Sequence, residues 1–265
     1  MTLAFASRCF ATFSLLFAMN LPLSAAEPAD NRERFEPRTY TAASGEKLHY
    51  RLLVPQNYDP QKKYPLVLFL HGAGERGDDN EKQLIHGMND FASDAIRAKY
   101  PAFVVAPQCP TGKKWVEVDW SAESHTMPAE PSISLRLTLE AVAALRKEFS
   151  IDADRQYLTG LSMGGYGVWD LLQRDPPRFA AAAPICGGGD PAFAKGLKDV
   201  PIWAFHGEKD TAVKPRRSRE MISAIKAAGG SPKYTEYSGV AHNSWAQTYA
   251  DPALYAWLFA QSRGK

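Results

Sequence analysis

The sequence has few cysteines and no long hydrophobic stretch in its body. Only three of its 265 residues are cysteine, and they form neither a Cys-x-x-Cys pair nor a cluster with histidine, so no metal site is predicted. Beyond the N-terminus there is no run of about 20 apolar residues, which argues against an internal membrane span. The formal net charge is only +2, with both signs interspersed, so no basic stripe for nucleic acid is present.

Residues 1–26 have the pattern of a cleavable export signal. An arginine at position 8 precedes an apolar run over residues 9–23, and the small residues at 24–26 fit a cleavage site. An uncleaved membrane anchor is the alternative, but the run is short for a span. We therefore predict a periplasmic or secreted protein with no stable membrane insertion after cleavage.

Two cysteines remain after the predicted cleavage, Cys109 and Cys186. An oxidising compartment would allow a disulfide between them. Two unpaired, half-buried thiols are an equal alternative, because the distance between the residues is not given by their spacing.

Strand-like and helix-like segments alternate along residues 38–265, which we interpret as one domain after an N-terminal extension at 27–37. Residues 64–70, YPLVLFL, form a continuous apolar run typical of a strand buried on both faces of a parallel sheet. The pattern predicts an α/β fold with a mostly parallel central sheet flanked by helices and an N-terminal antiparallel hairpin. The hairpin strands are expected at 38–43 and 47–54, the later strands at 64–72, 102–108, 155–160, 179–185, 200–207 and 232–239, and the helices at 80–100, 132–150, 163–175, 216–230 and 251–261.

Residues 109–132 break this alternation. The segment has no clear period, is rich in Pro, Ser and Trp, and follows the end of a predicted strand. Ligands bind outside the carboxyl ends of strands in open α/β sheets, so this insertion is a candidate for substrate recognition. A surface loop without function is the alternative.

Residues 160–164, GLSMG, carry the strongest chemical signal. Ser162 stands between Gly160 and Gly164, after a predicted strand and before a predicted helix. This is the strand–turn–helix context of a nucleophile elbow, in which glycines relieve crowding at a sharp turn. Taken alone, Gly and Ser are also ordinary loop residues.

A serine nucleophile needs a base and an acid that orients the base. On this fold they follow the serine in the order acid, then histidine. Asp210 and His242 each lie in a loop just past a predicted strand, in that order. Glu208 is the rival acid, two residues closer to its strand. The other five histidines precede the serine or the acid and fit less well as the base.

The oxyanion of such a reaction needs two hydrogen-bond donors. The backbone amide of Met163, directly after the nucleophile, is the first candidate. The second is the amide of Ala73 in the glycine-rich segment His71-Gly72-Ala73-Gly74, where backbone groups can approach a ligand closely.

The segments FLHGAGERGDDN, VVAPQCP, GLSMGGYGVWDL, FHGEKD and VAHNSW together resemble the α/β-hydrolase superfamily. More narrowly, they are similar to secreted esterases and predicted peptidases related to dienelactone hydrolases, phospholipase/carboxylesterases and prolyl oligopeptidase catalytic domains. The resemblance implies the α/β-hydrolase fold, with Ser162 as nucleophile, Asp210 as acid, His242 as base, and oxyanion amides at Ala73 and Met163. Dienelactone hydrolases use a cysteine nucleophile, so their lactone substrate is not implied here.

We therefore predict a secreted serine hydrolase that cleaves small, aryl or carbohydrate-linked carboxylic esters without a cofactor. The candidates for substrate binding are Trp115, Trp120, Trp245, Glu75 and Arg76. A prolyl-oligopeptidase-like serine peptidase is one alternative, although no propeller domain precedes the hydrolase segment. A non-catalytic binding protein on the same fold is the other.

Overall fold

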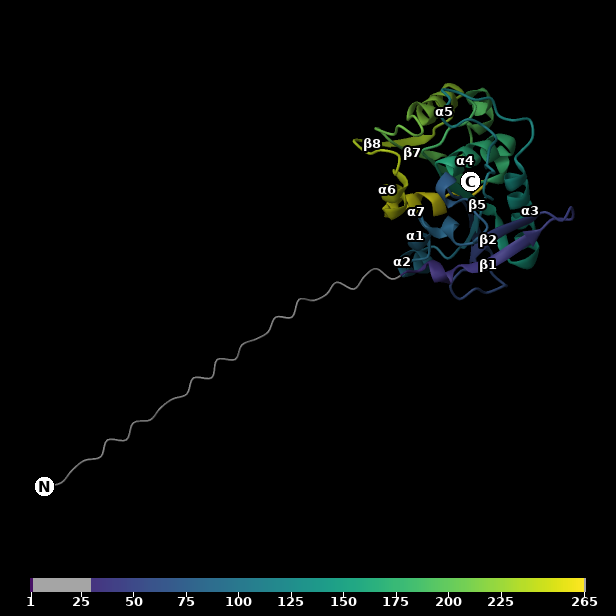
Figure 1. Ribbon diagram of the computed structural model, residues 1–265. Helices are drawn as coiled ribbons and strands as arrows, with labels where there is room; N and C mark the ends of the chain where they lie inside the picture. The colour runs from purple at the N-terminus through teal and green to yellow at the C-terminus, as the bar shows by residue number, and fades with distance from the viewer. Residues whose placement is uncertain (2–29, 265) are drawn as a thin grey trace.

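The computed structural model describes Met1 and residues 30–264 (Figure 1). The predicted cleavage site and the apolar run before it lie outside the described residues. Within the described part of the chain, no helix combines the length and the apolar character that a membrane crossing requires.

One eight-stranded sheet forms the centre of the fold, with the strand order β1-β2-β4-β3-β5-β6-β7-β8. The first three strands in this order pair antiparallel, and the pairs from β4 to β8 are parallel. Figure 1 shows β1 and β2 at one edge and β8 at the other. The strands are β1 Glu36–Thr41, β2 Lys47–Leu53, β3 Tyr64–Leu70, β4 Phe103–Pro107, β5 Ile151–Leu161, β6 Ala181–Ile185, β7 Trp203–Gly207 and β8 Lys233–Tyr237.

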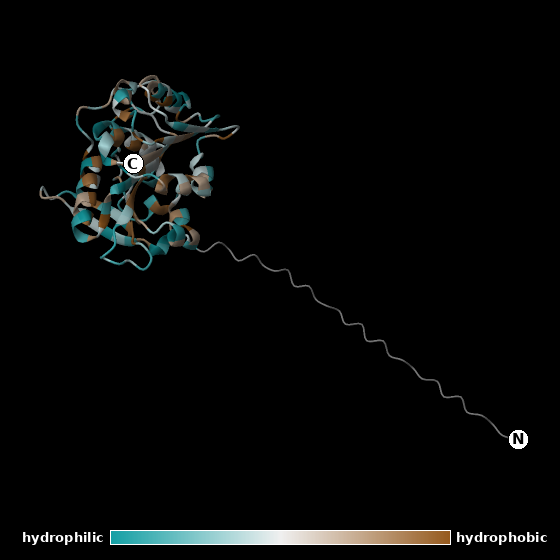
Figure 2. Ribbon diagram, turned by 180° about the vertical axis from the view of Figure 1, so that it is seen from behind, coloured by the Kyte–Doolittle hydropathy of each residue, from teal (hydrophilic) through white to brown (hydrophobic). Residues whose placement is uncertain are grey.

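Helices cover both faces of the sheet. Alternate residues of β3 point to opposite sides, and all seven are buried because each side is covered. Leu68 packs in a core with residues of α3, α4 and α5, whereas Phe69 packs with residues of α1, α6 and α7. In Figure 2 several of the helices around the sheet carry brown and teal residues side by side, as amphipathic helices on a sheet do. The helices are α1 Met88–Phe91, α2 Asp94–Lys99, α3 Ile133–Glu148, α4 Met163–Arg174, α5 Arg216–Ala227, α6 Trp245–Ala250 and α7 Pro252–Phe259.

Short 3-10 helices fill several of the connections: η1 Arg32–Arg34, η2 Ala73–Glu75, η3 Lys82–Leu84, η4 Pro176–Arg178 and η5 Pro191–Leu197.

The predicted mostly parallel α/β sheet and its N-terminal hairpin are confirmed. Two local predictions differ from the structure. The first strand begins at Glu36 and Phe35 is buried, so the last residues of the predicted extension belong to the fold. The predicted helix at 80–100 is divided into η3, α1 and α2. Gly87, with a φ of 74°, separates η3 from α1, and Ser93, which is extended and caps α2 through its side chain, separates α1 from α2.

Candidate active site

Ser162 lies at the turn between β5 and α4. Its φ of 53° and ψ of −118° place a non-glycine residue in a sparsely populated backbone region, which costs about 1–3 kcal/mol. Its side chain does not cap the helix that it precedes. The hydroxyl is therefore free for another partner.

The sharp turn depends on a close approach between two backbones. A Cβ on Gly164 would lie 1.9 Å from the carbonyl oxygen of Leu70, the last residue of β3. No side chain fits in that space. The glycine two residues after the serine is thus required by packing of the elbow against β3.

Three side chains predicted from separate segments come together at this turn. The Nε2 atom of His242 lies 2.9 Å from Ser162 Oγ, and its Nδ1 lies 2.7 Å from Asp210 Oδ2. Because an ionised carboxylate only accepts hydrogen bonds, Nδ1 carries the ring hydrogen and Nε2 is left to accept from the serine hydroxyl. The arrangement has the geometry of a nucleophile, a base and an orienting acid.

Asp210 is held as an anion inside the protein. Its side chain has no exposed surface, and burial alone would raise its pKa, but hydrogen bonds from His206, His242 and the Val213 backbone lower it. The backbone N–H groups of Ala212 and Val213 both donate to Oδ1 at 2.9 Å. This leaves Oδ2 to face the imidazole of His242.

The rival acid Glu208 lies elsewhere. Its carboxylate accepts hydrogen bonds from Ser238 Oγ at 2.9 Å and from the Gly239 N–H at 2.7 Å, and the bond from the Gly239 N–H lowers its pKa. It closes a turn rather than contacting the histidine.

The two predicted oxyanion donors begin helical segments. Ala73 is the first residue of η2 and Met163 the first of α4, and an N–H group at that position has no acceptor within its own helix. A Cβ on Gly72 would stand 3.6 Å from Ser162 Cβ, so the glycine-rich loop lies against the nucleophile.

His71 fixes the peptide that precedes Ala73. Its Nε2 accepts a hydrogen bond from the Cys109 N–H at 2.9 Å, so Nδ1 carries the hydrogen and donates to the Gly72 carbonyl at 2.6 Å. The C=O and N–H of a trans peptide point in opposite directions, so the Ala73 N–H faces away from the buried imidazole. Burial lowers the pKa of His71 to about 4, which keeps the ring neutral at pH 7.

Trp245 lies beside the base and Glu75 beside the oxyanion loop. The Trp245 ring meets the His242 ring edge-on, with centroids 5.2 Å apart, and lies 5.3 Å from the His86 ring. Glu75 is buried, with Oε1 3.5 Å from His86 Nε2. Its Oε2 lies 2.9 Å from the position that a Cβ on Gly72 would occupy. The two candidates are linked through His86, which the sequence analysis did not single out.

Arg76 and Trp120 lie together on another side of the oxyanion loop. The Arg76 Nε donates to the Ala73 carbonyl at 2.8 Å, and its guanidinium carbon stands 5.9 Å from the centroid of the Trp120 ring. The ammonium of Lys114 is 5.0 Å from the same ring. Trp120 is partly exposed.

Trp115 is placed differently from the expectation. It is fully buried, and its indole N–H donates to the His71 carbonyl at 2.9 Å. No face of this ring is open to a substrate, so the stacking contact expected of Trp115 is wrong for this conformation. The ring fills the core under the oxyanion loop because a large apolar side chain gains most by leaving water.

The irregular segment 109–132 is fastened to the body of the protein at several points. The buried Arg217 of α5 donates to the Glu123 carbonyl at 3.1 Å and lies 2.6 Å from His125 Nδ1. The Met127 N–H donates to Asp190 Oδ2 at 3.0 Å. Segment 109–132 contains no helix or strand, and these hydrogen bonds hold it against the rest of the domain.

Both remaining cysteines are buried and unpaired. The Sγ of Cys186 and side-chain donor atoms of Asp210 and His242 all lie within 4.8 Å of one another. The aspartate and histidine are already hydrogen-bonded to each other, and burial raises the pKa of the Cys186 thiol. We therefore assign these groups to the serine–histidine–aspartate arrangement and not to a metal.

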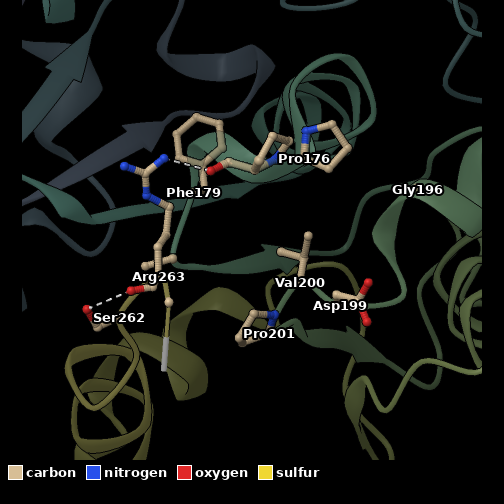
Figure 3. Close-up of a pocket in the computed structure, with 11 residues that line it drawn as sticks. Pro176, Phe179, Gly196, Asp199, Val200, Pro201, Ser262 and Arg263 are labelled. Carbon is tan, nitrogen blue, oxygen red and sulfur yellow. Dashed lines mark hydrogen bonds between the residues drawn. The ribbon is translucent and has the colours of Figure 1, made fainter.

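A hollow of about 340 Å³ lies beside the amino ends of the parallel strands, at the end of the sheet opposite to Ser162 (Figure 3). Phe179, Val200, Pro201 and Arg263 line it, next to the residues where β6 and β7 begin. Ser162 follows the carboxyl end of β5, which runs parallel to β6. None of the predicted site residues borders this hollow.

Eight parallel and antiparallel strands in this order, with an elbow serine after β5, define an α/β hydrolase. The family model named "Esterase" matches residues 41–232, and the chain belongs to this esterase family of the α/β-hydrolase superfamily.

Individual relatives have related descriptions. The chain is 26% identical over 167 residues to the bifunctional acetylxylan esterase/xylanase XynS20E of Neocallimastix patriciarum, covering 63% of this chain and 22% of that protein. It is 24% identical over 181 residues to "Probable feruloyl esterase C" of Aspergillus terreus, covering 68% and 62%. The chain thus spans less than two thirds of the length of either relative.

A crystal structure of a thermostable esterase superposes with a TM-score of 0.82 at 41% identity, covering 87% of this chain and 64% of that one. The acylaminoacyl peptidase of Pyrococcus horikoshii superposes with a TM-score of 0.64 at 16% identity, covering 88% of this chain and 42% of that one, and shares the fold.

Proposed function

We propose that this protein is a serine hydrolase that cleaves carboxylic esters through an acyl-enzyme on Ser162. The observation that carries the proposal is the unbroken line of hydrogen bonds from Asp210 through His242 to Ser162, at 2.7 and 2.9 Å. Hydrogen-bond distances of this size allow proton transfer to the base.

In the first half of the proposed reaction, Ser162 Oγ attacks the ester carbonyl carbon and its proton passes to His242 Nε2. The resulting oxyanion accepts hydrogen bonds from the Ala73 and Met163 amides. The alcohol then leaves with the proton from His242. Water then attacks the acyl-enzyme, with His242 again taking a proton and returning it to Ser162 Oγ. The acid product is released and Ser162 is regenerated.

The orientation of Ala73 supports its assigned role. A donor contributes to catalysis only if it is already aimed at the oxyanion, and one such donor is worth about 3–4 kcal/mol. The bond from His71 to the Gly72 carbonyl removes the freedom of the peptide to turn over.

We propose small, aryl or carbohydrate-linked esters as substrates. The partly exposed Trp120 and the Trp245 ring beside His242 can each contact a ring, and the names of two relatives, an acetylxylan esterase and a feruloyl esterase, agree with this class.

We also propose that residues 1–26 direct export to the periplasm or the medium and that the mature chain begins at or near Glu27, which N-terminal sequencing of exported protein would check. A relative described as a secreted protein supports this, with 26% identity over 219 residues.

Hydrolysis assays on the purified mature protein test the proposed activity. The panel should contain acetyl and aryl esters, acetylated and feruloylated sugars, and aminoacyl-prolyl and acylaminoacyl peptides. We expect turnover of esters that disappears in Ser162→Ala. Turnover of the peptides with none of the esters would favour a peptidase, and no turnover or covalent labelling of any kind would favour a binding protein.

A further inference from the structure

A second histidine contacts the carboxylate of the proposed triad from inside the protein. His206, in β7, is fully buried, and its Nε2 lies 3.2 Å from Asp210 Oδ2 and 2.8 Å from the Val213 carbonyl oxygen. Its Nδ1 lies 2.8 Å from Ser218 Oγ of α5. The mechanism above makes no use of this group.

The neighbours of His206 define where its hydrogen is. Its Nε2 faces a carbonyl oxygen and a carboxylate oxygen, and neither can donate, so Nε2 carries a hydrogen. Nδ1 of the neutral ring then accepts from Ser218 Oγ at 2.8 Å, and the Gly187 carbonyl oxygen, 3.1 Å from Oγ, is the second acceptor within reach of that single hydroxyl hydrogen. The imidazole is thus held from one side and donates to the acid loop on the other.

We propose that His206 is a positioning residue for the triad: its Nε2–H, shared between Val213 and Asp210, holds the carboxylate with Oδ2 facing His242. This inference rests on the proposed function. Without His206, the Oδ2 atom would have only His242 as a donor, and the loop that carries Asp210 would lose the hydrogen bond from the imidazole to the Val213 carbonyl. The Asp210 carboxylate has no contact with water, so a water molecule cannot replace a hydrogen-bond donor that the protein loses.

The other ionisable groups around His206 have partners of their own. Glu236 lies beside it in register on β8, and Arg219 of α5 binds both oxygens of that carboxylate at 2.8 and 2.5 Å. The Arg217 guanidinium donates hydrogen bonds to the Glu220 carboxylate and to the Glu123 carbonyl in segment 109–132. Cys186, at the end of β6, remains a neutral thiol because burial raises its pKa. Asp210 is therefore the acid that shares the His206 hydrogen.

The sharing has a consequence for the base. A carboxylate with fewer donors has more charge to offer, so removal of the His206 hydrogen bond strengthens the pull of Asp210 on a proton at His242. Protonated His242 is then favoured, and the acid limb of the kcat/KM profile moves to higher pH. Without the His206 hydrogen bond, Asp210 also orients the His242 ring less precisely, which lowers kcat at every pH.

The test compares His206→Leu with His206→Gln. Leucine removes the donor, and we expect kcat to fall about 10- to 100-fold, the scale of a hydrogen bond to a charged group, with KM changed little and the acid limb displaced upward. Glutamine can place an amide N–H near the position of Nε2, so it should restore most of kcat. Thr159→Val is the matched control: it removes the buried hydrogen bonds of Oγ1 with the Ala183 carbonyl and the Tyr249 hydroxyl, neither of which reaches the triad, and it should lower stability without moving the acid limb.

Equal losses in the leucine and glutamine variants, in step with a lower melting temperature and an unchanged acid limb, would overturn the proposal, as would a change in kcat of less than twofold in His206→Leu. A proton NMR measurement separates this failure from failure of the proposed function. If the wild type hydrolyses nothing, the hydrolase proposal fails. The downfield resonance of the His242 Nδ1–H still reports on Asp210, and a position identical in wild type and His206→Leu would refute the positioning role.

Discussion

At the scale of single residues, the account rests on one acid with four hydrogen-bond donors around it. Asp210 receives two backbone N–H groups and two imidazoles, and it has no exposed surface. Such a carboxylate keeps its charge inside the protein and fixes the tautomer of the histidine that it contacts.

Asp210→Asn tests this assignment. The amide can present its N–H to His242 Nδ1 and so stabilise the wrong tautomer, and we expect kcat to fall by several orders of magnitude, as is typical for such a change. Glu208→Gln is the control on the same loop, and it should leave kcat within about twofold because Glu208 contacts Ser238 and Gly239 instead. If the two results were exchanged, Glu208 would be the acid.

The residues that touch the reacting atoms were predictable, whereas those behind them were not. Ser162 and His242 follow strands in a recognisable order, and chemistry restricts their types. His206 precedes the acid in the sequence, an order that does not fit the base, so the motifs give it no role. Its proposed role depends on the loop after β7, which brings Asp210 back to within 3.2 Å of the His206 ring. The sequence does not reveal this contact. Its place just before Gly207 and four residues before the acid was the available signal.

At the scale of elements, two loops and one elbow must meet at a point. Gly164 allows the elbow to lie against β3, and Gly207 plays the same part for the acid and histidine loops, since a Cβ there would lie 2.0 Å from the Ala241 carbonyl oxygen. The strands themselves were predictable from their apolar runs. The division of the predicted helix at 80–100 was not, because it depends on the left-handed conformation of Gly87 and the extended conformation of Ser93.

Gly164→Ala should destabilise the protein by about 3 kcal/mol or more, because the methyl group would overlap backbone that cannot rotate away. Denaturant unfolding measures the change. Gly74→Ala is the matched control: nothing lies within 4 Å of the added Cβ, and its φ is not positive, so the free energy of unfolding should hardly change. Equal effects would show that the close approach to Leu70 is relieved by a small backbone shift.

The tryptophans of the segment 109–132 are expected to behave differently from each other. Trp115→Ala should lower the free energy of unfolding by about 3–5 kcal/mol, because a fully buried ring is lost. Trp120→Ala should mainly raise KM for a bulky aryl or sugar-linked ester relative to an acetyl ester, by several-fold, as expected for one aromatic contact. Equal losses of activity on both esters in Trp120→Ala would assign this ring to packing as well.

In the whole molecule, the buried His71 and the half-buried His125 make the free energy of unfolding depend on pH. Burial lowers the pKa of His71 from 6.5 to about 4, and burial together with Arg217 lowers that of His125 to about 4. As the pH falls, the two histidines are protonated near pH 6.5 in the unfolded chain but only near pH 4 in the folded protein. Their contribution to the free energy of unfolding is therefore complete above about pH 6.5 and is lost as the pH falls toward 4.

For His71, this difference corresponds to about 3 kcal/mol between pH 7 and pH 4. Urea unfolding at several pH values measures it, and His71→Asn, which cannot be protonated but keeps a donor for the Gly72 carbonyl, should flatten the slope. A slope in His71→Asn equal to that of the wild type would show that other groups cause the acid sensitivity.

The arrangement of the whole molecule also explains which predictions about substrates could not be made from the sequence. Segment 109–132 was recognised as unusual, but its fastening depends on Arg217, about 90 residues further along the chain. Long-range contacts of this kind leave no pattern within the segment. The burial of Trp115 likewise depends on a distant partner, because its indole N–H donates to the carbonyl of His71, 44 residues earlier in the chain.

The most direct test of the central claim is intact-protein mass spectrometry after reaction with a fluorophosphonate, followed by peptide mapping. We expect a single covalent adduct on the peptide that contains Ser162, absent in Ser162→Ala and formed much more slowly in Asp210→Asn. An adduct on another residue, or no adduct in folded wild-type protein, would contradict it.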